Sequence, residues 1–415
     1  MHFLYYLFIF LILFSFIVEI FLDFLNVRHR SRPIPDLLKD VYPPERYKIQ
    51  QNYDVENTKF NLIQKSLGIL LILGVIITGG FGWLHGWIMQ FNFNSIVTTV
   101  LFFTIIGAIS SIISLPFSVW DTFVIEERYG FNKTSAKLFI FDFIKSLLLT
   151  IIVGGGLLVL VTWLFYRTGD WFWILGLCVM VVFSFIANVL YSKVIVPLFN
   201  KQEPLEEGNL LESIKEFGKK VGFPLNKVFV IDGSKRSTKA NAYFTGFGKS
   251  RRVVLFDTLI EKLDQKEVLA VLAHEIGHYR RRHIWINMTI GVVQAAIFMY
   301  LFSRLSTNTE VSGALGYNDA SEPIFHLAII GFAILYSPIE SIIGLFTHWL
   351  SRRMEYQADA FATIHGLGND LINGLKKISA ENLSNLTPHP TYVFVNYSHP
   401  TLLQRIQKIL TLNKN

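Results

Sequence analysis

Seven long apolar stretches alternate with polar segments along the 415 residues of the chain. Each stretch is long enough to cross the hydrocarbon core of a bilayer, which takes roughly 20 residues of helix. They cover residues 3–25, 67–89, 96–118, 143–165, 171–191, 284–302 and 326–350. The first stretch has no basic segment before it and no small-residue cleavage site, so we interpret it as a retained span and not as a signal peptide. The pattern predicts an α-helical multi-span membrane protein with seven transmembrane helices.

Two long polar regions follow the fifth and the seventh apolar stretch. In the first of them, residues 210–221 have helical apolar spacing, whereas 227–231 and 252–256 have the pattern of short strands. Asp264 and Glu267 then have the spacing of a capping box, which predicts that a helix begins there. We therefore expect a small α/β domain outside the membrane. The predicted divisions are residues 1–191 with spans one to five, 192–283 with the α/β domain, 284–350 with spans six and seven, and 351–415 as a C-terminal part of that domain.

The composition and the charges agree with a membrane protein of defined orientation. Hydrophobic residues make up 52% of the chain and charged residues 17%, which excludes an ordinary soluble protein. The formal net charge is +7, and 35 of the 38 Lys and Arg residues lie within 26–66, 119–142, 192–283 and 351–415. Because basic loops stay in the cytosol, this asymmetry predicts a cytosolic C-terminus and an N-terminus that lies outside or in the lumen. The lipid bilayer is thus the expected partner of these charges, and no nucleic-acid partner is expected.

The pentapeptide HEIGH at residues 274–278 lies in the predicted helix that follows the capping box. Positions i and i+4 share one face of a helix, so His274 and His278 can reach the same Zn²⁺ ion. Glu275 would then act as the general base on a water whose pKa the metal lowers, and would pass the proton to the leaving amine. Cys178 is the single cysteine, so a paired-cysteine zinc site is excluded. The alternative interpretation is a surface helix that carries two unrelated histidines.

A catalytic zinc site needs a third protein ligand, and the best candidate follows the seventh span. Glu355 and Asp359 are again four residues apart, on the same predicted side of the membrane as HEIGH. Glu355 can bind the metal while Asp359 accepts a hydrogen bond from a zinc-binding histidine and so fixes its tautomer. The alternative is an ordinary acidic pair that offsets Arg352 and Arg353.

Several longer motifs resemble one known family, the CAAX prenyl protease 1 family of seven-span zinc proteases. They are HEIGH, SRRMEYQADAFA, NYSHPTLLQRI, FVIEERYGFN at 123–132, GSKRSTKANAYFTGF at 233–247 and VVLFDTL at 253–259. The resemblance runs from the first span nearly to the C-terminus. It implies a barrel of seven transmembrane helices around a large chamber and a small zincin-like α/β domain. It also implies Glu355 as third zinc ligand and Asp359 as its support.

The resemblance further implies residues that bind and act on a substrate. Asn241, Ala242 and Tyr243 match the segment that holds an extended peptide by strand addition. His399 and Arg405 match positions near the reacting carbonyl, where a donor stabilises the oxyanion. Without the resemblance, residues 241–243 are equally consistent with a plain hairpin, and His399 with a turn before Pro400.

These features favour a zinc metalloendopeptidase that cleaves a peptide or protein substrate near the C-terminus of prenylated CAAX-type proteins. Two alternatives stay open: a general quality-control protease for membrane proteins, and a zinc-bearing transporter or scaffold without catalysis. The histidines at positions 85, 326 and 348 lie in or beside apolar stretches, and we expect structural roles for them. His283 follows three arginines, Arg280 to Arg282, and we interpret this cluster as a topology anchor.

Overall fold

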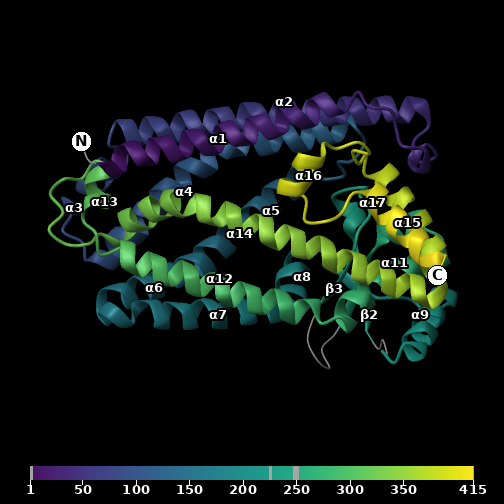
Figure 1. Ribbon diagram of the computed structural model, residues 1–415. Coiled ribbons are helices and arrows are strands. Elements are labelled where there is room, and N and C mark those ends of the chain that lie inside the picture. The colour runs from purple at the N-terminus through teal and green to yellow at the C-terminus, as the bar shows by residue number, and fades with distance from the viewer. Residues whose placement is uncertain (1–2, 224–226, 246–251, 415) are drawn as a thin grey trace.

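Long helices lie side by side over most of the molecule, and shorter helices and strands gather at one end (Figure 1). The structure is a computed structural model that describes residues 3–223, 227–245 and 252–414. The last two residues of the 233–247 motif, Gly246 and Phe247, lie outside the described residues. The long helices correspond to the predicted membrane part, and the gathered short elements correspond to the predicted α/β domain.

The membrane part contains helix in each of the seven predicted spans, although the second is interrupted. Its helices are α1 (Phe3–His29), α2 (Pro44–Ile77), α3 (Gly80–Met89), α4 (Ser95–Trp120), α5 (Ala136–Leu149), α6 (Gly155–Thr168), α7 (Phe172–Leu190), α12 (His283–Leu305) and α14 (Phe325–Ala362). Within the described residues, six helical stretches are long and apolar enough to cross a membrane. One of them, Ala136–Phe199, contains two of the predicted spans. A turn at Gly169, where φ is +50°, separates these two spans.

The boundary predicted for the second span was wrong. The apolar stretch 67–89 contains a break, because α2 ends at Ile77 and α3 begins at Gly80. Gly79 has a φ of +67°, and a Cβ on Gly82 would lie 2.2 Å from the backbone carbon of Gly316. The break therefore depends on close backbone packing that only glycine allows, and hydropathy does not detect such a tertiary contact.

The seventh span does not end with its apolar stretch. The predicted span stops at residue 350, but α14 continues as one 38-residue helix to Ala362. Glu355 and Asp359 both lie on this continuation. The same helix thus contains the seventh apolar span and carries two candidate site residues.

A small mixed sheet lies at the same end of the membrane part as helix α11 (Gln265–Arg280). Its strands are β1 (Gln202–Pro204), β2 (Val228–Ile231), β3 (Ala242–Thr245) and β4 (Arg252–Phe256), in the order β1-β2-β4-β3. β2 and β4, the two strands predicted from the sequence, pair in parallel. β3 pairs antiparallel with β4, with Ala242 opposite Leu255, and is an edge strand of the sheet. An edge strand has backbone groups available to pair with another chain.

Most of the remaining helices lie around the sheet or the C-terminal half of α14, whereas one of them, Glu310–Ala314, packs against α1 and the start of α14 (Figure 1). They are α8 (Val196–Phe199), α9 (Asn209–Lys220), α10 (Asp257–Lys262), α11 (Gln265–Arg280), α13 (Glu310–Ala314), α15 (Gly368–Glu381), α16 (Pro390–Asn396) and α17 (Leu402–Asn413). Short 3₁₀ turns cover Asp36–Leu38, Gly169–Trp171 and Gly233–Lys235, and π-helical turns cover Asp121–Glu126, Thr150–Gly154, Tyr191–Ile195 and Thr363–Leu367. One apolar core joins the sheet to α9, α10, α11, α15 and α17: Leu38, Phe131, Leu272 and Ile406 belong to it although they lie far apart in the chain. Helix α13 belongs to a separate core with α1 and α3.

Candidate metal centre

Helix α11 places the two histidines of HEIGH in a fixed position. The side chain of Asp264 accepts from the backbone N–H of Glu267, and the Glu267 carboxylate accepts from the N–H of Asp264, so the predicted capping box is present. Val268, Leu272 and Ile276 lie four residues apart and are buried in the core. The anchored start and the buried stripe hold α11 rigidly, which is what a metal-binding pair on one turn requires.

The glycine of HEIGH allows α11 to approach α14 closely. A Cβ on Gly277 would lie 2.9 Å from the Cα of Ala358 and 3.0 Å from the Cβ of Phe361. Ala358 lies between Glu355 and Asp359 on α14, so the contact brings both carboxylates next to the histidines. A side chain at position 277 would push the two helices apart and move the carboxylates away from them.

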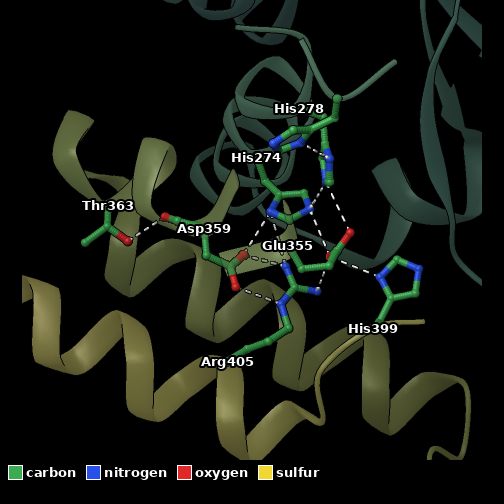
Figure 2. A network of polar contacts seen from close by, with 8 residues as sticks. His274, His278, Glu355, Asp359, Thr363, His399 and Arg405 are labelled. Carbon is green, nitrogen blue, oxygen red and sulfur yellow. Dashed lines mark hydrogen bonds and ion pairs between the residues drawn. The ribbon is translucent and has the colours of Figure 1, made fainter. Parts of the chain in front are cut away.

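Three side chains direct one donor atom each to a common point (Figure 2). The Nε2 atoms of His274 and His278 are 3.1 Å apart. The Glu355 carboxylate lies 3.2 Å from His278 Nε2 through Oε1 and 3.5 Å from His274 Nε2 through Oε2. Among the described residues, this is the only group of three or more His, Cys, Asp or Glu donors gathered within 4.8 Å.

The arrangement fits a metal ion better than it fits hydrogen bonds alone. Oε2 of Glu355 is buried, and no described residue donates a hydrogen bond of acceptable geometry to it. A buried carboxylate oxygen without a donor is costly unless a cation takes the place of the donor. Burial raises the pKa of Glu355, but the nearby rings of His274, His278 and His399, at 3.0 to 3.5 Å, outweigh it and hold the pKa well below its usual range. Glu355 is therefore the ionised, electron-pair-donating form that a divalent cation needs.

Asp359 and Arg405 support His274 from behind (Figure 2). Asp359 is fully buried, and its Oδ1 lies 2.8 Å from His274 Nδ1. Arg405 donates to both carboxylate oxygens of Asp359, from Nη2 at 2.6 Å and from Nε at 2.9 Å. Burial raises the pKa of Asp359, but the charge of Arg405 and the bond to His274 outweigh it, and the pKa is lowered. An ionised Asp359 accepts the Nδ1 proton of His274, which leaves the Nε2 lone pair directed to the common point.

A cavity of about 550 Å³ opens in front of these donors and contains nearly all the predicted site residues. Those that line it are Asn241, Ala242, Tyr243, His274, Glu275, His278, Glu355, His399 and Arg405. Asp359 is the exception, because it lies behind His274. The structure therefore gathers residues from four distant segments of the sequence into one site.

The two residues expected near the reacting carbonyl are placed differently. His399 is the more exposed: 65% of its side chain is accessible, and its Nδ1 lies 3.0 Å from Oε2 of Glu355. Arg405 is largely buried, and its Nε and Nη2 bind Asp359. Its Nη1 lies 3.8 Å from Oε2 of Glu355. The geometry thus leaves His399 free to meet a substrate and commits most of Arg405 to Asp359.

Two family models together match nearly the whole chain. The model described as the CAAX prenyl protease N-terminal region with five membrane helices matches residues 23–201. The model of peptidase family M48 matches residues 204–413. The chain belongs to the CAAX prenyl protease 1 family of M48 peptidases.

Individual relatives of this M48 peptidase cover almost its full length. It is 36% identical to CAAX prenyl protease 1 of Saccharomyces cerevisiae, over 90% of this chain and 87% of the yeast protein. It is 31% identical to the human CAAX prenyl protease 1 homolog, over 97% and 95% of the two chains. The crystal structure of S. mikatae Ste24p superposes with a TM-score of 0.92 at 32% identity, over 99% of each chain. The fold, the multi-pass membrane class and the metalloprotease class predicted from the sequence are confirmed.

The M48 peptidase has two polar side chains at its metal centre whose role the sequence did not indicate. His283, which the sequence places in a basic topology anchor, lies 2.9 Å from His278 through the Nδ1 atoms of both rings. Its Nε2 lies 2.9 Å from Oε1 of Gln357. Residues five positions apart do not share a helix face, so no periodic signal connected His283 with His278.

Proposed function

We propose that this chain is a zinc-dependent endopeptidase that hydrolyses a peptide bond near the C-terminus of prenylated CAAX-type proteins. The observation that carries the proposal is the convergence of His274, His278 and Glu355 in the cavity that Glu275 also lines. Three donors from side chains leave a coordination position open, which distinguishes catalytic zinc sites from closed structural ones. The names of the relatives, CAAX prenyl proteases in yeast and human, support the substrate class.

Zinc is the metal that the donor set favours. Two imidazole nitrogens and one carboxylate oxygen form the His₂Glu set typical of catalytic zinc, whereas Mg²⁺ and Ca²⁺ prefer oxygen ligands alone. Bound zinc supplies a Lewis acid at this position and lowers the pKa of a nearby water towards about 7. We propose His274, His278 and Glu355 as its ligands and Asp359 as the support of His274.

The other residues of the site then have separate roles in catalysis. Glu275 takes the proton of the attacking water and delivers it to the nitrogen of the leaving amine. His399, exposed at the cavity, donates a hydrogen bond to the oxygen of the carbonyl under attack. Asn241, Ala242 and Tyr243 lie in and beside the edge strand β3, where a substrate can add as a further strand. Arg405 holds Asp359 in place, because its bidentate bond leaves only Nη1 towards the cavity.

A second cavity supports a substrate that carries a lipid. It has a volume of about 650 Å³, lies between α7 and α12, and shares Ile284 and Asn287 with the metal-site cavity. Apolar residues such as Met180, Phe185 and Val292 form most of its wall. A hydrocarbon chain can lie in this cavity at membrane level while the peptide extends along β3. A general quality-control protease has no need for an apolar cavity next to its catalytic cavity.

We also propose that the metal centre and the C-terminus face the cytosol. The basic residues concentrate in the polar regions on that side, and the N-terminus then lies outside or in the lumen. The chain offers a simple test, because Cys178 is its single cysteine. The test uses sealed vesicles whose cytosolic face is on the inside. In a Cys178→Ser background, the cysteine of Asn413→Cys should react with a membrane-impermeant maleimide only after these vesicles are permeabilised. Labelling of intact sealed vesicles from the opposite face would contradict this orientation.

Purified protein and one synthetic substrate test the function. The probe is a farnesylated CAAX peptide, compared with the same peptide without the farnesyl group and with an unfolded membrane protein. We expect zinc-dependent cleavage of the farnesylated peptide, and much slower cleavage of the other two. Equal cleavage of all three substrates would favour the quality-control alternative. A zinc-loaded protein that cleaves none of them would favour the transporter or scaffold alternative.

A further inference from the structure

The two histidines of the metal centre are held by different partners. His274 directs its Nδ1 to the carboxylate of Asp359 at 2.8 Å. His278 directs its Nδ1 to another imidazole, His283, at 2.9 Å, and His283 continues to the side-chain amide of Gln357 at 2.9 Å. His283 is 2% exposed, so water does not compete strongly for its ring nitrogens. The second arrangement is a chain of three side chains that ends on an uncharged group.

A turn between two helices makes this series of contacts possible. On a continuous helix, a residue five positions after His278 would point about 140° away from it. Here α11 ends at Arg280, and Arg282 has a left-handed backbone with φ at +60° before α12 begins at His283. The turn brings the His283 ring back to a centroid distance of 5.0 Å from the His278 ring, at an interplanar angle of 74°. Arg282 is one of only three non-glycine residues with positive φ in the described chain, and such conformations often persist beside functional sites.

The positions of the protons follow from Gln357, the last of these three side chains. The Oε1 atom of Gln357 is a carbonyl oxygen, which can only accept, so Nε2 of His283 must carry the proton. A neutral His283 then has a lone pair on Nδ1, and Nδ1 of His278 must be the donor of their shared hydrogen bond. His278 therefore has its own lone pair on Nε2, the atom that lies 3.1 Å from Nε2 of His274. The reverse order of donors would place a proton on Nε2 of His278 and block it as a ligand.

From this geometry we infer that His283 and Gln357 are positioning residues, which hold His278 in the tautomer and orientation that bind the metal. The inference rests on the proposed function, because it treats His278 as a ligand. It also assigns a common purpose to α14: Glu355 supplies a donor atom, Gln357 orients one histidine through His283, and Asp359 orients the other. One continuous helix thus sets all three donors.

Zinc affinity of the full-length protein in detergent, measured by competition with a chromophoric chelator, tests this inference without an activity assay. Outer partners of metal-binding histidines typically change metal affinity by about 10–100-fold when removed. We expect His283→Leu to raise the Kd for zinc within that range, and Gln357→Leu to raise it by a smaller factor. His283→Asn should recover much of the lost zinc affinity. The Oδ1 atom of asparagine lies where Nδ1 of His283 lies, and it can accept the same hydrogen bond from His278.

Controls separate positioning from a general loss of structure. Gln357 is exposed, so Gln357→Leu should fold even if His283→Leu does not. Gln407→Leu makes the same change at an exposed position of α17 and should leave the Kd unchanged. The visible absorption of Co²⁺ substituted at the site should also change in His283→Leu and Gln357→Leu, because a reoriented imidazole alters the ligand field.

The outcomes are distinguishable. If the wild-type protein binds zinc, and His283→Leu and Gln357→Leu keep its Kd and Co²⁺ spectrum, the inference is wrong while the proposed function stands. If His283→Leu does not fold, a Gln357→Leu protein with the wild-type Kd and Co²⁺ spectrum is enough to overturn the inference. If the wild-type protein binds no zinc, the proposed function itself fails, and this inference fails with it.

Discussion

Two pairs of histidines come from helices at opposite ends of the molecule, one from α11 and the other from α3 and the start of α14 (Figure 1). Only the first pair is built as a metal centre. His274 and His278 approach to 3.1 Å near α14's C-terminal half. His85 of α3 and His326 of α14 approach to 2.9 Å at the other end. Distance between imidazoles therefore does not distinguish the two pairs, and the difference must come from their surroundings.

The surroundings differ in the partners of each ring. The first pair has Glu355 as a third donor, and carboxylate or imidazole partners on both Nδ1 atoms. In the second pair, Nδ1 of His326 bonds the hydroxyl of Thr99 at 3.1 Å, and the edge of His85 contacts the Tyr317 ring. No third His, Cys, Asp or Glu donor joins this pair within the part of the chain that the structure describes. Two features therefore distinguish the metal centre from a histidine pair that only joins two helices. The metal centre has a third, charged donor, and the Nδ1 atom of each of its histidines has a partner that directs Nε2 to the metal.

Removing the third donor should have the largest effect. Glu355→Ala takes away the only carboxylate donor of the first pair, so we expect the purified protein to lose its zinc and all peptidase activity. Elemental analysis after removal of loosely bound metal measures the first result. His326→Ala, at the second pair, is the matched control and should keep the zinc. A Glu355→Ala protein with wild-type zinc content would exclude Glu355 as a ligand.

The next largest effect should come from the proposed general base. Glu275→Gln keeps the shape of the side chain but cannot take a proton, so kcat should fall by about 100–10,000-fold. Zinc content should stay unchanged, because Glu275 is not among the three converging donors. Cleavage of a farnesylated CAAX peptide, with metal content measured on the same sample, checks both expectations. Substantial activity in this variant would remove Glu275 from the mechanism.

Breaking the support of His274 should cost both stability and metal affinity. Asp359→Asn removes the charge that balances the largely buried Arg405, and loss of one partner of a buried ion pair costs about 3–5 kcal/mol. Zinc affinity should fall by about 10–100-fold because the tautomer of His274 is no longer fixed. Denaturation in detergent and chelator competition measure the two effects. A variant that is as stable as the wild type would show that the pair contributes little.

The acidity of His274 predicts opposite pH dependences for metal binding and for the stability of chelator-treated protein. Burial and Arg405 lower the pKa of His274, but the bonds to Asp359 and Glu355 outweigh them and raise it to about 9. Because the proton must leave before zinc binds, the Kd should fall by about 50-fold between pH 7 and pH 9. In chelator-treated protein the protonated ring stabilises the fold. Since its pKa in the unfolded chain is near 6.5, this stabilisation should be complete below that pH and disappear as the pH rises through 9. A flat zinc affinity over this range would contradict the assignment.

The smallest effect should come from the second histidine pair. His326→Leu removes the partner of both His85 and Thr99 and leaves polar atoms buried without one, which costs about 1–3 kcal/mol. The melting temperature should therefore decrease, while zinc content and peptidase activity per folded molecule stay unchanged. Loss of a second equivalent of metal in this variant would show that both pairs bind metal.

The sequence was a good guide wherever a signal is local or periodic. Hydropathy located the spans, and the i, i+4 spacing together with the capping box placed His274 and His278 on one helix. Glu355 followed from its own i, i+4 pair and from the resemblance to the family. The division of the chain at residues 191, 283 and 350 stays a prediction. The large chamber that the resemblance implies also stays a prediction, because the described cavities are separate spaces of about 200 to 650 Å³.

The sequence did not reveal features that depend on contacts between distant segments. The early end of α2 depends on Gly79 and Gly82 packing against Gly316, which lies more than 200 residues away. The bond between Arg405 and Asp359 joins two segments whose motifs give no sign of pairing. His283 returns to His278 only because Arg282 adopts a left-handed backbone, a conformation that residue type alone does not predict for arginine.

Anomalous diffraction at the zinc absorption edge, from crystals of the unmodified protein grown with zinc, tests the central claim most directly. We expect one peak per chain, between Nε2 of His274, Nε2 of His278 and the carboxylate of Glu355. No peak should lie between His85 and His326. A site between the first three residues that stays empty, or a peak at the second pair alone, would contradict the account.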